Sequence, residues 1–388
     1  MSVTHPKGFV AAGVAAGLKT SGNKDVALVV NTGPRDTAAA VFTSNRIQAA
    51  PITWSKQAIA DGQVRAVVLN SGGANACTGP EGFADTHHTA EHVAKLLGTS
   101  SGDVLVCSTG LIGERLNMPA LTAGITDAAT HLSDTGGPDA AHAIMTTDSV
   151  AKMATHNAHG WSVGGMAKGA GMLAPALATM LCVITTDADI APETAQRALA
   201  QATSTTFDRI DSDGCMSTND TVILLASGAS GITPTEAEFT TAITAVAKDL
   251  SRALINDAEG ASHDIAVTVT HATSEDAALA VARSITRSNL VKTAIFGNDP
   301  NWGRVLASLG TVPTHVAPYE PDAIDVTING VTVCRNGGVG DDRTLVNLAA
   351  HRDVHIVVNL NAGDHPPVTV WTNDLTHDYV HENSAYST

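Results

Sequence analysis

Short apolar runs, bounded by glycine, proline or polar residues, recur along the whole chain and predict β-strands. The predicted strands are residues 26–31, 38–43, 64–70, 104–107, 180–186, 220–226, 265–270, 323–328, 331–334, 355–360, 368–372 and 379–382. Apolar residues at helical spacing predict helices over residues 84–97, 121–132, 140–145, 192–203, 235–258 and 275–287. Because strands come in adjacent pairs with long helices between them, the pattern predicts an α+β fold of layered helices and sheets.

Two pairs of predicted strands are joined by strong turn sequences. Residues 26–31 and 38–43 flank Thr-Gly-Pro-Arg-Asp and are predicted to form a hairpin. Residues 323–328 and 331–334 flank Asn329-Gly330, which is typical of a type I′ hairpin turn. The apolar stretch 8–18 is only weakly hydrophobic, and Lys19 follows it where a signal peptide would have its cleavage site. We therefore expect it to be part of the fold.

One central stretch, from Lys168 to Asp187, has no charged residue between its ends. Two glycines and a proline argue against a transmembrane helix. A dinucleotide fingerprint would follow a strand and open a helix, whereas here the glycines lead into a β-rich run. What remains is a loop that delivers the Thr179 hydroxyl to the start of a buried strand, and simple packing of that threonine is the alternative.

Composition narrows the class of protein. The 388 residues are 44% hydrophobic and only 15% charged, with a formal net charge of −16. A chain without a basic surface is not expected to bind nucleic acid or anionic membranes. Its five cysteines form no C-x-x-C motif, which favours free thiols in a reducing cytoplasm.

Local chemistry offers several candidate sites. Thr109 and Gly110 follow a predicted strand, where backbone N–H groups can form an oxyanion hole. His88 and His92 share a helix face, but no third ligand accompanies them, and a solvated face is the favoured interpretation. Residues 211–214 resemble a calcium loop, yet Arg209 stands at its first ligand position, so a polar turn is predicted. No metal site is expected.

Several motifs together resemble one family. The most specific is Lys168-Gly-Ala-Gly-Met-Leu-Ala-Pro-Ala-Leu-Ala-Thr179. The others are residues 6–9, 19–22, 70–79, 108–113, 144–148, 297–304 and 383–388. In this order, over the whole chain, they resemble the ornithine acetyltransferases, the glutamate N-acetyltransferases of arginine biosynthesis.

The resemblance implies a layered αββα-type sandwich of the ornithine acetyltransferase or DmpA-like kind, with an additional C-terminal α/β part. It implies autocatalytic cleavage between Ala178 and Thr179. The α chain (1–178) and the β chain (179–388) would stay together, in an α2β2 assembly. Thr179 would become an N-terminal nucleophile, and its own α-amine, with a reference pKa of about 7.7–8.0, would be its base.

The family's reaction, carried over by resemblance, moves acetyl from acetylornithine to glutamate by a ping-pong route through acetyl-Thr179, without a cofactor. Thr109 and Gly110 match the oxyanion-hole pair. The positions that match substrate-binding residues are Thr146, Lys168, Thr179, Glu259, Asn383 and Thr388. Whether Thr146 or Thr147 faces substrate stays open at this point. It also stays open whether the chain has a second activity with acetyl-CoA as donor. Whether it is a paralogue that serves secondary metabolism stays open as well. The rival function is an N-terminal-nucleophile amidohydrolase or aminopeptidase using the same Thr179.

Overall fold

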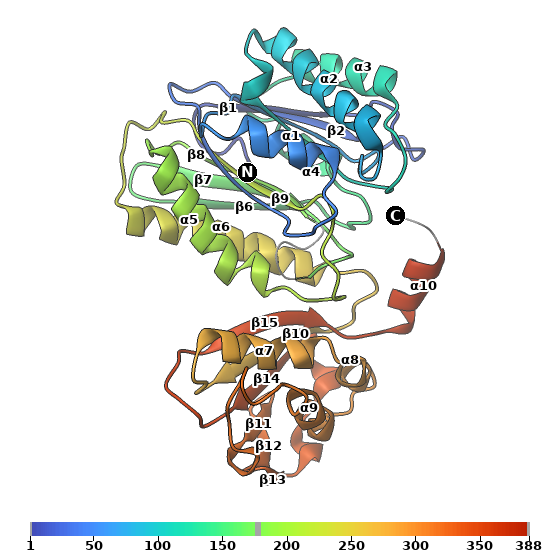
Figure 1. Cartoon of the computed structure of the whole chain (residues 1–388), viewed down its shortest axis with the longest axis vertical. Helices are drawn as coiled ribbons and strands as arrows, with labels where there is room; N and C mark the ends of the chain where they lie inside the picture. The colour runs from blue at the N-terminus through green and yellow to red at the C-terminus, as the bar shows by residue number, and fades with distance from the viewer. Residues whose placement is uncertain (1, 175–179, 386–388) are drawn as a thin grey trace. The chain divides into compact units, whose positions relative to one another are not determined.

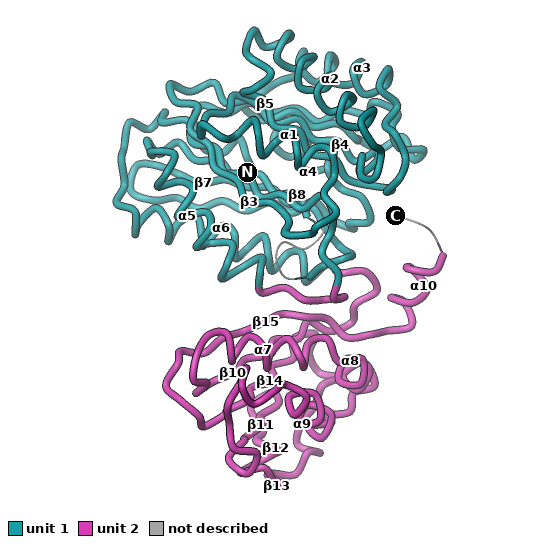
Figure 2. The backbone as a smooth tube through the Cα atoms, viewed as in Figure 1, with its two compact units in different colours: residues 1–208, 215–257, 388 teal, residues 209–214, 258–387 magenta. Residues whose placement is uncertain are grey.

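The computed structural model describes residues 2–174 and 180–385, which form two compact units (Figure 2). Among these residues, unit 1 comprises 2–174, 180–208 and 215–257, and unit 2 comprises 209–214 and 258–385. The predicted division into 1–178 and 179–388 concerns a cut in the backbone rather than a boundary between units, and it stays a prediction.

Unit 1 is built on two β-sheets whose inner faces share one apolar core. The first sheet, in spatial order, is β1 (Phe9–Val14), β2 (Val26–Asn31), β4 (Ala66–Asn70) and β5 (Val104–Ser108). The second is β3 (Thr37–Phe42), β9 (Thr221–Ala226), β8 (Leu181–Thr186), β7 (Ser162–Lys168) and β6 (Lys152–Asn157). Side chains such as Val29 and Leu69 of the first sheet and Val183 and Ile223 of the second are fully buried in that core.

Helices cover the outer faces of both sheets of unit 1 (Figure 1). The apolar sides of α2 (Gly79–Leu97) and α3 (Met118–Thr130) pack on the first sheet. On the second sheet lie α5 (Pro192–Thr205) and α6 (Glu236–Asn256). The two shorter helices are α1 (Ala50–Ala58), beside β5, and α4 (Gly137–Ala143), beside β1 and β2. The resulting order of helix, sheet, sheet and helix confirms the predicted α+β class and its αββα layering.

The predicted hairpin of residues 26–31 and 38–43 is wrong. β2 pairs with β1 and β4 in the first sheet, whereas β3 pairs with β9 in the second. The turn therefore carries the chain from one sheet to the other. Turn residues specify a change of direction, but the partner of a fully buried strand is chosen by long-range packing.

The hairpin of β6 and β7 was not predicted. Gly164 and Gly165 lower the strand propensity of its second arm. The structure shows why glycine is needed there, because a Cβ on Gly164 would lie 2.2 Å from the backbone oxygen of Ser2. This hairpin ends at Lys168.

Unit 2 contains one mixed sheet with the spatial order β13-β12-β11-β14-β10-β15. Its strands are β10 (Asp264–Thr270), β11 (Asp325–Ile328), β12 (Val331–Arg335), β13 (Gly338–Val339), β14 (Asp353–Asn359) and β15 (Val368–Asn373). Its helices are α7 (Glu275–Thr286), α8 (Asn289–Phe296), α9 (Trp302–Leu309) and α10 (His377–Ala385). The unit is the predicted C-terminal α/β part. Its β11–β12 hairpin is confirmed, with positive φ at both Asn329 and Gly330.

The strand predicted over residues 379–382 is wrong, because these residues lie inside α10. The helix start is marked by Thr376, whose hydroxyl accepts the Tyr379 amide at 2.9 Å. A threonine whose hydroxyl accepts the amide three residues later is an N-cap arrangement. This N-cap was not predicted from the sequence.

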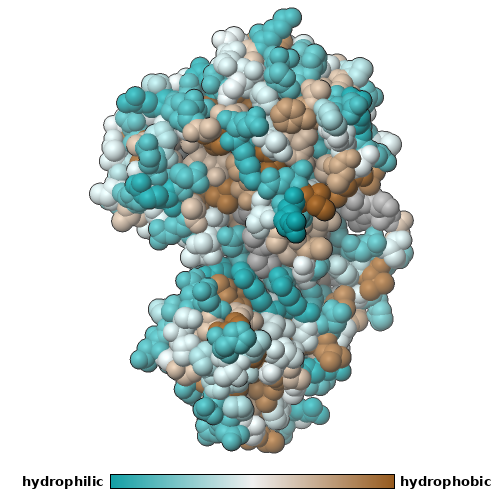
Figure 3. Space-filling model, viewed as in Figure 1, coloured by the Kyte–Doolittle hydropathy of each residue, from teal (hydrophilic) through white to brown (hydrophobic). Residues whose placement is uncertain are grey.

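The surface is mixed in character. On the face drawn in Figure 3, hydrophobic residues are scattered among hydrophilic ones. Within residues 2–174 and 180–385, no helix has both the length and the apolar character that crossing a membrane requires.

Candidate active site

Thr179, Ala178 and Thr388 lie outside the described residues. The description resumes at Met180, whose backbone is fixed on both sides. Its amide donates to Asp220 Oδ1 at 3.1 Å, and its carbonyl accepts the Thr221 amide at 3.1 Å. Because Leu181 begins β8, the residue after Thr179 leads directly into a central strand of the second sheet. The described chain thus resumes, at Met180, at the start of a rigid element.

Thr109 and Gly110 follow the end of β5, beside the glycine-rich loop that follows β4. The Thr109 amide donates to the Asn70 carbonyl at 3.0 Å, and Thr109 forms a β-bridge with Gly73. Gly110 has φ +130°, and a Cβ there would lie 2.9 Å from both the Cα and the N of Gly73. Thr109 is 4% exposed, and its hydroxyl has no hydrogen-bond partner in the described part of the chain. This arrangement leaves a buried donor available for an incoming oxyanion.

Lys168 and Thr146 are brought together by the fold. Lys168 ends β7 and is 1% exposed, and its Nζ donates to Thr146 Oγ1 at 3.1 Å. The geometry thus selects Thr146 rather than Thr147 as the hydroxyl that faces the lysine. Burial lowers the pKa of Lys168, against the attraction of Asp148 and Asp220. No carboxylate of residues 2–174 or 180–385 lies within ion-pair distance of its ammonium.

A buried carboxylate, Asp148, holds both of these residues in place. Its Oδ2 accepts the Thr146 amide at 3.0 Å, and its Oδ1 accepts the amide of Gly169, the residue after Lys168, at 2.6 Å. Lys152 Nζ donates to the same Oδ1 at 2.6 Å and to Asp257 Oδ2 at 2.5 Å. Burial opposes ionisation of Asp148, but Lys168, Lys152 and the Gly169 amide together hold its pKa below the ordinary value.

Replacing this carboxylate tests the network. In Asp148→Asn one amide nitrogen must face a donor, and Lys152 loses an ion-pair partner. We expect the free energy of unfolding at neutral pH to fall by about 3–5 kcal/mol, as when a buried ion pair is broken. The folded-state pKa of Asp148 is depressed, so its contribution is complete above its unfolded pKa of about 3.9 and is lost as the pH falls through the folded value. Urea unfolding should therefore show the two proteins converging in stability below about pH 4.

The matched control for that experiment is Asp139→Asn, which removes a surface ion pair with Lys24 and whose carboxylate is 60% exposed. Its expected effect is no more than about 1 kcal/mol. A difference between wild type and Asp148→Asn that stays constant with pH would contradict the assignment.

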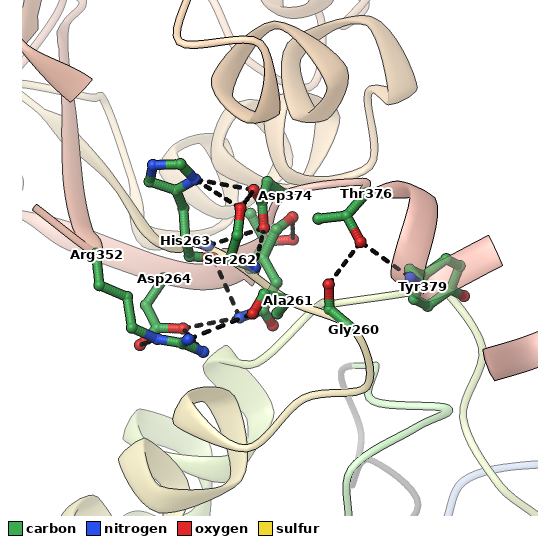
Figure 4. A network of polar contacts seen from close by, with 11 residues as sticks. Gly260, Ala261, Ser262, His263, Asp264, Arg352, Asp374, Thr376 and Tyr379 are labelled. Carbon is green, nitrogen blue, oxygen red and sulfur yellow. Dashed lines mark hydrogen bonds and ion pairs between the residues drawn. The ribbon is translucent and has the colours of Figure 1, made fainter. Parts of the chain in front are cut away.

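Glu259 belongs to unit 2 and precedes a tightly held turn (Figure 4). Gly260 has φ +59°, and a Cβ there would lie 2.1 Å from the amide nitrogen of Tyr379. The Gly260 carbonyl also accepts the Thr376 hydroxyl at 2.5 Å. Glu259 itself is 8% exposed, and its carboxylate has no hydrogen-bond or ion-pair partner in the described part of the chain. The turn thus fixes a buried carboxylate for which the described residues provide no cation.

The turn continues into a polar cluster of Ser262, His263 and Asp374. These are the residue types of a catalytic triad, but their geometry differs from that of a triad (Figure 4). His263 Nδ1 lies 2.8 Å from Asp374 Oδ2, and the Ser262 hydroxyl bonds to that same oxygen and that same ring nitrogen. In a triad the acid and the nucleophile bind opposite ring nitrogens. The cluster therefore ties the turn to the end of β15 rather than activating Ser262.

The other candidates are found in separate places. Asn383, on α10, is exposed, and its amide donates to the Tyr379 carbonyl of the same helix at 3.0 Å. His88 is 69% exposed, and His92 bonds to Thr126 at 2.8 Å. Asp211 pairs with Arg287 at 2.7 Å inside unit 2, as a structural turn would. The residues that sequence reasoning missed are Lys152, Asp148, Asn219 and Asp220. The one feature of the sequence that could have identified them is a charged or amide side chain next to a buried segment.

Comparisons with known proteins agree with one another. The sequence profile of the ArgJ family matches residues 10–388. The "Arginine biosynthesis bifunctional protein ArgJ" of Streptomyces coelicolor is 62% identical over 387 residues, and that of Thermobifida fusca is 61% identical over 388; each alignment covers 100% of both chains. A crystal structure of the Mycobacterium tuberculosis ornithine acetyltransferase complexed with ornithine is 55% identical. It covers 46% of this chain and 96% of its own, with a TM-score of 0.45.

Proposed function

The chain belongs to the ArgJ family, and we propose that it transfers acetyl from acetylornithine to glutamate through a covalent acetyl-Thr179 intermediate. The observation that carries this proposal is the buried Lys168 ammonium, which forms no ion pair with a carboxylate of the described residues, although Asp148 and Asp220 attract it. Buried charges are normally paired. An α-carboxylate is the anion that both acetylornithine and glutamate bring, and Lys168 is the cation to receive it, with Thr146 beside it.

Glu259 is the second buried charge that a ligand would pair. It is a buried carboxylate without a cationic partner in the described part of the chain. Ornithine carries ammonium groups and glutamate carries one, so a ligand ammonium would satisfy it. We propose the same ligand-binding role for Asn383 and Thr388, on the resemblance of the C-terminal motif alone.

In the first half-reaction, Thr179 Oγ attacks the acetyl carbonyl carbon of acetylornithine. Its proton passes to the α-amine of Thr179, which cleavage after Ala178 has made free. The carbonyl oxygen becomes an oxyanion, which the Thr109 hydroxyl and the Gly110 amide stabilise. The C–N bond then breaks, and the proton goes to the departing ornithine amine. This leaves an acetyl ester on Thr179.

The second half-reaction reverses these steps with a different amine. The amine of glutamate attacks the ester carbonyl and gives up a proton to the α-amine of Thr179. The bond to Thr179 Oγ then breaks, and the α-amine returns that proton to the hydroxyl. The products are N-acetylglutamate and free enzyme. No oxidant, metal or cofactor enters the balance of either half-reaction. We further propose that the two chains form an α2β2 assembly in a reducing cytoplasm, where the five free cysteines would stay reduced.

Glutamate dependence tests the transfer. With acetylornithine as donor, we expect continuous ornithine release only when glutamate is present, because the acetyl-enzyme needs an amine to discharge it. Without glutamate, release should stop at about one equivalent per active site. The measurement is ornithine and N-acetylglutamate by chromatography. Equal ornithine release with and without glutamate would establish the amidohydrolase or aminopeptidase instead. Replacing acetylornithine by acetyl-CoA in the same assay tests the second donor.

A further inference from the structure

A buried polar loop, residues 217–220, connects to the start of β9, and the mechanism above does not use it. Its four residues, Ser217, Thr218, Asn219 and Asp220, are between 0% and 8% exposed. Burying so many polar side chains is unfavourable unless each one is hydrogen-bonded. The bonds that these side chains make connect the loop to both halves of the proposed catalytic machinery.

Asp220 binds the residue that follows the nucleophile. It is 0% exposed, and its Oδ1 accepts the Met180 amide at 3.1 Å, while Oδ2 accepts the Ser217 amide at 3.0 Å. Burial raises its pKa well above the ordinary value, against the pull of these amides and of Lys168. Within residues 2–174 and 180–385, no basic group lies within ion-pair distance of it. Because burial disfavours a carboxylate at this position, we attribute the presence of Asp220 to the two backbone amides that it binds.

Asn219, the preceding residue, binds the loops that form the oxyanion site. Its Nδ2 donates to the Ser108 carbonyl at 2.8 Å and to the Ala74 carbonyl at 2.6 Å. Ser108 immediately precedes Thr109, and Ala74 immediately follows Gly73, the glycine against which Gly110 packs. One side-chain amide thus ties together the two loops that meet at Gly110.

We propose that residues 217–220 are a clamp that fixes the nucleophile relative to the oxyanion hole: Asp220 holds the Met180 amide, and Asn219 holds the Ser108 and Ala74 carbonyls. This inference rests on the proposed function. Because the two side chains are neighbours in sequence, a single peptide unit sets the separation of the two halves. Neither residue has to touch substrate, so both are positioning residues.

The clamp has a specific kinetic signature. Attack requires Thr179 Oγ about 3–3.5 Å from the acetyl carbon while the oxyanion meets its donors, and a displacement of about 1 Å can cost about 100-fold in rate. Lys168 and Thr146, the residues proposed to bind the substrate carboxylate, make no hydrogen bond to the clamp, but the Asp220 carboxylate attracts Lys168. Loss of the uncharged Asn219 amide should therefore lower kcat and leave KM nearly unchanged, whereas the effect of a change at Asp220 is read from kcat.

The experiment compares two buried carboxylates, Asp220 before the start of β9 and Asp187 after the end of β8. In Asp220→Asn, one of the two backbone amides must face an NH2 group. Asp187→Asn is the matched control, since Asp187 follows the end of β8, is 3% exposed and accepts the amides of Ser162 at 2.7 Å and Lys7 at 3.2 Å. We expect the matured Asp220→Asn enzyme to lose about 100-fold in kcat. Asp187→Asn should keep a kcat close to that of wild type. Equal kcat values for the two variants would overturn the clamp.

A second variant covers the case in which Asp220→Asn is not processed. If that chain is folded by circular dichroism but uncut, while Asp187→Asn is cut, the clamp is supported at the cleavage step. If it is unfolded, Asn219→Ala decides: the same loss of kcat at unchanged KM supports the clamp, and a wild-type kcat overturns it. Unfolding of both clamp variants also overturns it, because the loop would then be needed for folding alone. If the wild-type protein itself fails to acetylate glutamate, the proposed function is refuted instead. That result is known before any variant is compared.

Discussion

Thr179→Ala will leave the chain uncut and inactive. The substitution removes the hydroxyl that we propose to attack the Ala178 carbonyl during cleavage and the acetyl group during catalysis. On a denaturing gel, the variant should run as one band of 39.6 kDa, whereas mature wild type resolves into chains 1–178 and 179–388. Acetyl transfer should fall by at least about 10⁴-fold, the scale seen when a covalent nucleophile is deleted.

Thr179→Ser is the control, because it keeps a hydroxyl and, after cleavage, an α-amine beside it. It should cut itself and retain measurable transfer. Two outcomes count against the account: a Thr179→Ala chain that still divides into two bands, or an uncut Thr179→Ala chain that still transfers acetyl at an appreciable fraction of the wild-type rate.

The second large effect is expected from Gly110→Ala. Backbone at φ +130° is strained for any residue with a Cβ, by about 1–3 kcal/mol. The new Cβ would also lie 2.9 Å from the Gly73 backbone, so the two loops must separate. Displacing an oxyanion donor typically costs about 10²–10³-fold in kcat. We expect that loss with KM little changed, measured by initial rates on the fully cleaved variant.

Gly113→Ala separates strain from displacement. Gly113 lies in the same loop with φ +87°, but apart from its chain neighbours no atom of the described residues lies within 4 Å of a Cβ built there. It should lose comparable thermal stability and keep nearly full activity. If Gly110→Ala and Gly113→Ala have the same kcat, close packing at position 110 does not support catalysis.

Local sequence was sufficient to predict most elements of the fold. Apolar periodicity located strands such as β8 and β10, and Asn329-Gly330 predicted the β11–β12 hairpin correctly. Strand partners were harder to predict, because the buried strands β2 and β3 carry no polar face to show which sheet they join. The β6–β7 hairpin was missed for a related reason. Its glycines are there to let the Ser2 backbone approach, a contact that joins residues distant in sequence.

The candidate site divides in the same way. Thr109, Gly110, Thr146 and Lys168 stand in motifs that are specific in sequence, and the structure places Lys168 on Thr146. The residues behind them were not predicted. Asp148 looked like the polar end of a helix, and Asp220 like the first residue of a strand, since nothing local shows that a carboxylate is buried against the amide of a residue 21 or 40 positions away.

The charged residues of the candidate site differ in whether they have ion-pair partners. Lys152 pairs with both Asp148 and Asp257, so one cation faces two carboxylates, and Lys168 also attracts Asp148. Lys168 and Glu259 are a buried cation and a buried carboxylate that form no ion pair among the residues that the structure describes, although Asp148 and Asp220 attract Lys168. Each of these charges, taken by itself, favours a ligand that brings the opposite charge over an uncharged amide.

The most direct test of the central claim is the intact mass of the two chains after incubation with acetylornithine in the absence of glutamate. The account predicts that the chain beginning at Thr179 gains the mass of one acetyl group, that peptide mapping places it on Thr179, and that adding glutamate removes it as N-acetylglutamate. An unmodified chain under conditions where the enzyme turns over acetylornithine, or an acetyl group on any other residue, would contradict it.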